Sequence, residues 1–208
     1  MGNRGRFGKY GEIKRLDRLR HAGIKGPPHI RPETRALKGD APFRKEASQR
    51  ILVKIRQAAG PDTPFIEELS RRVFHVYGPY EDMIPRWFES RTTVTLVAVM
   101  DRRPVGFAMV GRLSEEAHDH PGLELLALAV EPQKQKLGIG EMLLKEIEKV
   151  VVGQNVKRWF LHTAKDNLPA RRLFTRCGYR TCKLREGFYP SGQDALLMVR
   201  DLEVGNPG

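Results

Sequence analysis

A turn with two glycines one residue apart, Gly138 and Gly140, constrains the fold of this chain more than any other feature. It follows an apolar run at 123–130 and precedes a stretch, 139–151, whose apolar residues recur at helical spacing. Glycine costs backbone entropy and weakens the start of a helix, so the chain must need a bare backbone at this point. A buried strand, a tight turn and a helix in this order predict a strand–helix–strand unit of an α/β protein.

The chain from residue 51 onward alternates between strand and helix patterns. Runs rich in β-branched and apolar residues predict strands at 51–58, 92–100, 105–113, 123–130, 157–164, 180–187 and 194–202. Apolar periodicity and capping residues predict helices at 62–78, 79–90, 139–151 and 167–179. The predicted fold class is therefore α/β, with a mixed, curved central sheet of about six to seven strands flanked by helices.

Local signals mark the ends of two of these helices. Asp62 is a candidate N-cap for the helix at 62–78. For the helix at 167–179, Asn167 is the candidate N-cap, Pro169 falls in the first turn, and Gly178 suits the C-terminal end. Three agreeing signals make the last helix the best defined of the set.

Basic residues are concentrated in the N-terminal segment, residues 1–50. This segment has 14 Lys and Arg against 5 Asp and Glu, a net charge of +9 out of +12 for the whole chain. The remaining residues, 51–208, therefore carry only +3. Glycine, proline and arginine recur in the segment and large aliphatic residues are few, so we expect a basic, largely disordered tail before a domain at 51–208. A short helix over 11–23 is also expected within it.

Three interpretations of the basic segment stay open. Its arginines, with Phe7 and Tyr10, suit contact with the phosphates of RNA or of the ribosome. It could equally be a solvated tail without a partner. The third interpretation is that the true start of the protein lies downstream of Met1.

The cysteines and the apolar runs bear on the cellular compartment. Cys177 and Cys182 form no CxxC pair, so we expect reduced thiols and no metal site. No apolar run approaches the roughly 20 residues that a membrane span requires. No apolar stretch follows Met1 as in a secretory signal. We expect a cytoplasmic protein that does not bind membranes.

The Gly138–Gly140 turn has the features of an anion site. Backbone N–H groups at a helix N-terminus point outward, and glycines allow a diphosphate to approach them closely. Lys136 adds positive charge, and the amide of Gln135 could donate to a phosphate oxygen. A dinucleotide-binding fingerprint would need a further glycine at Leu143. On the two glycines alone, a tight turn without a ligand is an equally good interpretation.

A wider pattern resembles the GNAT superfamily of N-acetyltransferases. The family has a Val-x-Pro strand end followed by Arg/Gln-x-x-Gly-x-Gly/Ala, and this chain fills those places with Val130, Pro132, Gln135, Gly138 and Gly140. A second family block is filled by Asn167, Ala170, Phe174, Gly178 and Tyr179. The resemblance covers about residues 51–200 and implies acetyl-CoA as co-substrate.

The resemblance also implies which residues contact acetyl-CoA. The main chain of Leu128, Ala129 and Val130 would hold the pantetheine arm, which Asn167 would help to seat. The pyrophosphate would lie on Gln135, Lys136, Leu137, Gly138, Ile139 and Gly140. Phe174 is placed among the cofactor contacts, but it stands where the family usually has a tyrosine that is often proposed as the acid. Water, Tyr179 or Tyr189 would then have to supply that proton.

Two residues are candidates for the general base, because an amine must be neutral to attack a thioester. Glu124 comes first: it lies on an otherwise apolar strand, on the face expected for Leu126 and Leu128, and the histone-acetyltransferase branch has its base at the matching position. His162 comes second, at a strand position where some N-terminal acetyltransferases have a glutamate. A salt-bridged glutamate and a core histidine are the structural alternatives.

The acceptor amine is suggested by residues near the C-terminus. The stretch resembles ribosomal-protein-alanine and related N-terminal acetyltransferases at Phe188, Tyr189, Pro190, Asp194, Ala195 and Met198. Tyr189 would contact the acceptor, with Tyr77 and Tyr80 on the opposite wall. A protein or peptide N-terminal α-amine is therefore the expected substrate. A small-molecule amine, or a non-catalytic acyl-CoA-binding or RNA-binding regulator, is the alternative.

Overall fold

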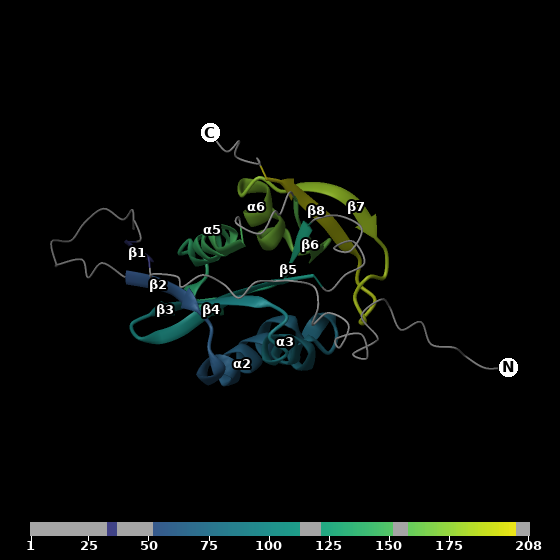
Figure 1. Ribbon diagram of the computed structural model, residues 1–208. Coiled ribbons are helices and arrows are strands. Elements are labelled where there is room, and N and C mark those ends of the chain that lie inside the picture. Colours follow the sequence, from purple (N-terminus) through teal and green to yellow (C-terminus); the bar gives the residue numbers. More distant parts are fainter. Residues whose placement is uncertain (1–32, 37–51, 113–121, 152–157, 203–208) are drawn as a thin grey trace.

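The computed structural model describes residues 33–36, 52–112, 122–151 and 158–202, and these form one sheet with helices on both faces (Figure 1). The strands are β1 (Glu33–Ala36), β2 (Leu52–Gln57), β3 (Val94–Met100), β4 (Arg103–Gly111), β5 (Gly122–Val130), β6 (Arg158–Ala164), β7 (Arg180–Arg185) and β8 (Ala195–Asp201). Their order across the sheet is β1-β2-β3-β4-β5-β6-β8-β7. All neighbours pair antiparallel except β5 and β6, which pair in parallel.

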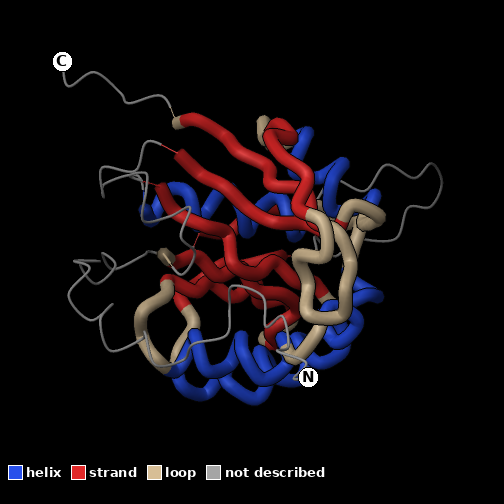
Figure 2. The backbone as a smooth tube through the Cα atoms, turned by 90° about the vertical axis from the view of Figure 1, so that its right-hand side faces the viewer, coloured by secondary structure: helices blue, strands red, loops and turns tan. Residues whose placement is uncertain are grey.

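The helices divide into two pairs. They are α2 (Thr63–Phe74), α3 (Tyr80–Glu89), α5 (Ile139–Val151) and α6 (Leu168–Arg176), with short 3-10 turns η2 (Gly60–Asp62), η3 (His75–Tyr77) and η4 (Pro132–Lys134). Figures 1 and 2 show α2 and α3 on one side of the sheet and α5 and α6 on the other. Each pair buries its apolar stripe against the sheet, so two apolar cores lie on opposite faces.

The predicted fold class is confirmed. The seven strands and four helices expected between residues 51 and 202 are all present, with ends that differ by a few residues. The sheet has an eighth strand because β1, which falls within the predicted N-terminal tail, pairs antiparallel with β2. The rest of that tail, including the helix expected over 11–23, lies outside the described residues.

The predicted caps hold for one helix but not for the other. Oδ1 of Asn167 accepts a hydrogen bond from Ala170 N–H at 3.2 Å, and Gly178 adopts a φ of 87° just beyond the C-terminal end of α6. Asp62 does stand directly before α2, but its side chain does not cap the helix. Its carboxylate instead pairs with the Arg56 guanidinium, at 2.7 and 2.8 Å, and accepts from Ala59 N–H.

A β-bulge changes the faces of β5. Met109 of β4 lies opposite Ala127, but the next residue, Val110, lies opposite Leu125. Leu126 is therefore an extra residue on β5, and the alternation of faces reverses there.

The bulge corrects one expectation about Glu124. Leu125 packs in the core under α5 and α6, so Glu124 points to the opposite face, toward α2 and α3. Leu126 packs on that face too, as expected, but Leu128 packs with Leu125 on the other side. Glu124 and Leu128 thus do not share a face, because the inserted residue lies between them.

The parallel pairing of β5 and β6 is short. It runs only from Gly122, opposite Arg158, to Leu125, opposite Leu161, although β5 continues to Val130. Beyond Leu125 the two strands diverge, and this edge of β5 has no pairing with β6. The divergence of the two central strands opens the space in which the candidate site lies.

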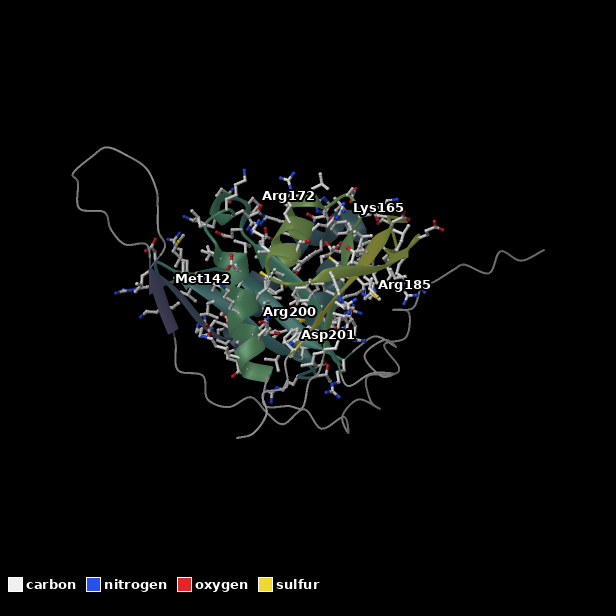
Figure 3. The ribbon with its side chains drawn as sticks, turned by 90° about the horizontal axis from the view of Figure 1, so that it is seen from above. Met142, Lys165, Arg172, Arg185, Arg200 and Asp201 are labelled. Carbon is white, nitrogen blue, oxygen red and sulfur yellow. The ribbon has the colours of Figure 1, made fainter. Side chains whose placement is uncertain are left out.

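Ion pairs fix the β7–β8 hairpin to its neighbours. Asp201 on β8 lies between Arg158 of β6, at 2.6 Å, and Arg180 of β7, at 3.0 Å. Arg200 reaches Glu148 of α5 at 2.7 Å, and Figure 3 labels Arg200 and Asp201 at this end of the hairpin. The exposed pairs of Asp201 each contribute little to stability, whereas the pair of Arg200 with Glu148 is partly buried.

Three features of the described residues concern the predictions about the cysteines, metal sites and membrane spans. Cys177 and Cys182 are both free thiols. Within the described part of the chain, His, Cys, Asp and Glu side chains do not gather in groups that could hold a metal ion. No helix in that part is long and apolar enough to cross a membrane.

Candidate active site

A cavity of about 90 Å³ lies where β5 and β6 diverge. Residues 124–128 of β5 and 161–164 of β6 line its two strand walls. The other walls come from α6, from the α2–α3 segment and from the loop between β7 and β8, which contribute Asn167, Ala170, Phe174, Phe74, Tyr77, Tyr80, Ile84, Trp87, Phe188 and Tyr189. The cavity therefore joins the cofactor side predicted from the sequence to the predicted acceptor side.

The two candidate bases contact each other inside this cavity. Nδ1 of His162 lies 2.9 Å from Oε1 of Glu124, and the two side chains are 4% and 3% exposed. Glu124 lies opposite Phe160 in the β5–β6 register, and His162 is two residues further along β6, on the same face. Two residues that the sequence offered as alternatives thus form one hydrogen-bonded pair.

The contact determines where the pair can accept a proton. When Glu124 is ionised it can only accept, so a neutral His162 donates through Nδ1–H and keeps its lone pair on Nε2. Among the described residues, His162 Nε2 and Glu124 Oε2 are both buried without a hydrogen-bond partner. Phe188 stacks on the imidazole with ring centroids 4.2 Å apart, which fixes the plane of the ring. The pair can therefore take up a proton at Nε2.

The three tyrosines predicted to bind the acceptor lie together on the cavity wall. The ring of Tyr189 lies 4.8 Å from that of Tyr77 and 6.0 Å from that of Tyr80, and Tyr80 packs edge-on against Trp87. Burial raises the pKa of the Tyr80 and Tyr189 phenols above their ordinary value. Both phenols stay protonated at neutral pH and present hydroxyl groups next to an apolar surface.

Two hydrogen bonds hold the β7–β8 loop over the cavity. Nε2 of Gln193 donates to the carbonyl of Val76 at 2.6 Å. The Ser191 N–H donates to the carbonyl of Tyr77 at 3.3 Å. Because both acceptors belong to η3, the β7–β8 loop and the α2–α3 segment are joined and together cover the cavity. We call this cover the roof of the cavity.

Asp194 fixes the base of the same loop. Its carboxylate accepts from Gly187 N–H at 3.1 Å and pairs with Nζ of Lys165 at 3.3 Å; Lys165 is labelled in Figure 3. The hydrogen bond from Gly187, followed by that from Lys165, holds the pKa of this exposed carboxyl below its usual range. Asp194 thus joins the two ends of the loop and ties them to the end of β6.

Gly138, just before α5, and Gly140, in its first turn, are required for different reasons. Gly138 has a φ of 80°, and a Cβ there would meet no atom within 4 Å. Lys136 also has positive φ, at 62°. A Cβ on Gly140 would lie 3.2 Å from Leu173 of α6. Gly138 therefore keeps an open, strained turn free of side chain, whereas Gly140 permits close helix packing.

The side chain of Gln135, a predicted phosphate contact, also bonds within the chain. Nε2 of Gln135 donates to the carbonyl of Val130 at 3.1 Å, which ties the glycine turn to the end of β5. This bond uses one of the two hydrogens of the amide NH2 group, so the second can still donate to a phosphate oxygen. Ile139 is buried in the core, and Ala129 is buried under α2 and α3, so each offers only its main chain to the site.

Residues of α6 form one wall, and one of the two candidate acids lies outside it. Asn167 and Phe174 line the cavity, and Phe174 packs edge-on against Tyr179 at 5.8 Å. Tyr179 is buried in the α5–α6 core, and its hydroxyl has no partner among the described residues. It does not line the cavity, so it cannot replace the hydroxyl that Phe174 lacks.

Some contributors to the site were not foreseen. The stacking of Phe188 on His162 and the contact of Tyr77 Oη with Asn167, at 3.5 Å, join segments that are distant in the sequence. Phe74 and Ile84 also line the cavity. The aromatic residues around position 77 gave a local signal for this wall, but both contacts depend on how the β7–β8 loop, η3, β6 and α6 pack together.

The chain is similar to known proteins in both sequence and fold. A family model described as the acetyltransferase (GNAT) family matches residues 61–179. An uncharacterized N-acetyltransferase of Methanocaldococcus jannaschii is 31% identical over 147 residues, which are 70% of this chain and 90% of the relative. An N-alpha-acetyltransferase of Sulfurisphaera tokodaii is 26% identical over 170 residues, 76% of this chain and 98% of the relative. Arabidopsis thaliana NAA60, solved with acetyl-CoA, has the same fold with a TM-score of 0.62 and 22% identity, over 72% of this chain and 98% of its own.

Proposed function

The chain belongs to the GNAT family of acetyltransferases, and we propose that it transfers the acetyl group of acetyl-CoA to the N-terminal α-amine of a protein or peptide. The observation that carries this proposal is the buried Glu124–His162 pair, whose Nε2 atom has no partner among the described residues. The pair lies between the divergent strands and the aromatic wall, so a donor and an acceptor can reach it from different sides.

Features of β5 and of the glycine turn fit acetyl-CoA as co-substrate. The edge of β5 beyond Leu125 is not paired with β6, so its main chain is available to the amides of a pantetheine arm. The open space at Gly138 and the first N–H groups of α5 suit a pyrophosphate, with Lys136 adding positive charge. An elongated ligand held along a strand places its thioester at a fixed point beside His162.

The reaction then needs one proton removed from the amine. The neutral amine attacks the thioester carbon, a C–N bond forms, and the C–S bond breaks with its electron pair left on sulfur. His162 accepts the amine proton at Nε2, and the Glu124 carboxylate stabilises the imidazolium that results. From the sequence, Glu124 is preferred over His162 as the general base. In this mechanism His162 takes the proton, and Glu124 holds the tautomer of His162.

The lining of the cavity favours an α-amine over a polyamine. Glu124 is the only carboxylate among the described residues that line it, and that carboxylate is already paired with His162. A polyamine carries several cations and would need several acidic partners. The aromatic wall instead suits a peptide end with one amine and an apolar first side chain. The Sulfurisphaera tokodaii relative, named as an N-alpha-acetyltransferase, supports the same acceptor class.

A thiol-release assay with acetyl-CoA tests the proposal. The acceptors are a panel of short peptides with different free N-termini, the same peptides blocked at the α-amine, spermine, and free lysine. We expect turnover with one class of free N-terminus and none with its blocked counterpart. Turnover with spermine and with no peptide would contradict the proposal in favour of a small-molecule enzyme. Acetyl-CoA binding without turnover on any acceptor would point to a regulatory acyl-CoA binder.

We also infer that the basic N-terminal segment contacts RNA or ribosomal phosphates, since it carries +9 within residues 1–50. Removal of residues 1–32 deletes nine Lys and Arg with two Asp and Glu, and it keeps β1. The shortened chain should lose salt-dependent RNA affinity and still acetylate a free peptide at the original rate. Equal RNA affinity of the two chains would contradict this inference.

A further inference from the structure

The thiolate that leaves during acetyl transfer needs a proton, and α6 does not supply it. Phe174 lines the cavity but carries no hydroxyl, and Tyr179 lies in the core behind it. Among the described residues that line the cavity, hydroxyl groups belong to Tyr77, Tyr80, Thr163 and Tyr189. Of these four, Tyr77 is the one that bonds to a side chain of the α6 segment.

The side-chain amide of Asn167 determines the direction of that bond. Its Oδ1 caps α6 by accepting from Ala170 N–H at 3.2 Å. The Nδ2 end is thereby directed to Oη of Tyr77, 3.5 Å away. Because an amide nitrogen can only donate, the phenol oxygen is the acceptor in this contact. The hydrogen of the Tyr77 hydroxyl is not used there and is available to another acceptor.

The position of Tyr77 is fixed at three points. Its carbonyl accepts from Ser191 N–H, its ring packs against that of Tyr189 at 4.8 Å, and its hydroxyl contacts Asn167. The hydroxyl therefore lies at the N-terminal end of the α6 face that lines the cavity. Tyr80 is oriented differently, since it lies near Glu124 and so on the side of the base.

We propose that Tyr77 donates a proton to the departing sulfur, in place of the hydroxyl that position 174 lacks. This inference rests on the proposed acetyl transfer. As the C–S bond breaks, its electron pair stays on sulfur, and the Tyr77 O–H proton moves to it to form the thiol. His162 has gained one proton from the amine and Tyr77 has lost one. Proton exchange with solvent restores both residues, so no other reactant is needed.

The environment keeps the Tyr77 phenol in the protonated form that this step requires. Burial raises its pKa above the ordinary value of 10.0, the hydrogen bond from Asn167 lowers it, and the Asp166 carboxylate raises it. The net effect is upward, so the hydroxyl carries its proton at neutral pH.

The first test compares Tyr77→Phe with Tyr179→Phe. Both remove one phenolic oxygen, but Tyr179 is buried outside the cavity. For Tyr77→Phe we expect kcat on a peptide to fall by about 10²-fold, with acetyl-CoA affinity little changed. In the original protein, kcat should decline at high pH because the acid loses its proton, and this decline should be absent in Tyr77→Phe. Tyr179→Phe should keep both the original kcat and the decline. A Tyr77→Phe kcat within about threefold of the original, with the decline intact, would overturn the proposal.

A second measurement does not depend on the acceptor. The thiol of bound CoA is titrated through the ultraviolet absorbance of its thiolate, in the original protein and in Tyr77→Phe. A hydroxyl that donates to this sulfur stabilises the thiolate, so the thiol pKa should be higher in Tyr77→Phe. Equal thiol pKa values would overturn the role of Tyr77. If this titration shows the shift but no peptide is acetylated, the acceptor assignment fails and the contact of Tyr77 with sulfur stands.

Discussion

Nδ1 of His162 lies 2.9 Å from Oε1 of Glu124, at the point where β5 and β6 begin to diverge. The contact joins residues 38 positions apart and is shielded from solvent on both sides. It assigns complementary roles to the two groups, because the carboxylate fixes the imidazole tautomer and the imidazole presents its free nitrogen.

The two members of the pair should act as one unit. His162→Gln removes the base and should lower kcat by about 10²-fold to 10⁴-fold. Glu124→Gln should also lower kcat, because an amide can bind Nδ1 through either end and no longer fixes the tautomer. The double variant should be no slower than His162→Gln alone. Steady-state kinetics on one peptide provides the check, with acetyl-CoA affinity as the control for folding. Losses that multiply in the double variant would show that the residues act independently.

The glycine turn should be essential for acetyl-CoA. Gly138→Val introduces a Cβ into the open space of the turn and strains a φ of 80°. We expect acetyl-CoA affinity, measured by calorimetry, to fall at least about 100-fold. Gly192→Val is the matched control, since Gly192 also has positive φ and open space but lies in the acceptor loop. It should keep its acetyl-CoA affinity. Unchanged affinity of Gly138→Val would refute the phosphate role of the turn.

The roof of the cavity should set peptide affinity. Gln193→Ala removes the 2.6 Å hydrogen bond to Val76 that holds the loop in place. Loss of one such bond should raise the peptide KM by about 2-fold to 10-fold and leave acetyl-CoA affinity unchanged. Gln193→Glu should have the larger effect, because it places a carboxylate against a carbonyl oxygen. If both variants keep the original KM, the loop does not shape the acceptor site.

The Arg56–Asp62 pair should stabilise the fold in a pH-dependent way. Burial raises the pKa of Asp62, but the hydrogen bonds from Arg56 and Ala59 outweigh it, and the net pKa is below the ordinary 3.8. The stabilisation is therefore present above about pH 4 and is lost as pH falls through the folded-state pKa. Asp62→Asn should lower the free energy of unfolding by about 1–3 kcal/mol at pH 7 and by less at pH 3. Urea unfolding at both pH values measures the difference, and a constant difference would contradict the ionic origin.

Features fixed by local sequence were the ones that could be predicted. The cap of Asn167, with Pro169 and Gly178, needs only residues of its own helix, and it formed as expected. Asp62 occupied the predicted N-cap position but bonded to Arg56 on β2, because a charged partner from another element competes with the helix N–H groups. Local pattern gives the candidates for a bond, and tertiary structure selects among them.

Features fixed by strand register could not be read from the sequence. The extra residue Leu126 separates the faces of Glu124 and Leu128, and a period of two cannot reveal a bulge. Similarly, only the β5–β6 alignment brings His162 next to Glu124. Glu124 is a candidate from the sequence because it is a polar group on an otherwise apolar strand, and His162 because it stands where some N-terminal acetyltransferases have a glutamate. Their relationship depends on which strands are neighbours.

A peptide that carries both a free α-amine and an internal lysine tests α-amine transfer by His162 directly. The peptide is incubated with acetyl-CoA and the protein, and the acetylated position is located by fragmentation mass spectrometry. We expect a single acetyl group on the α-amine, formed by the original protein and nearly absent with His162→Gln. Acetylation of the lysine side chain alone, or an undiminished rate with His162→Gln, would contradict α-amine transfer by His162.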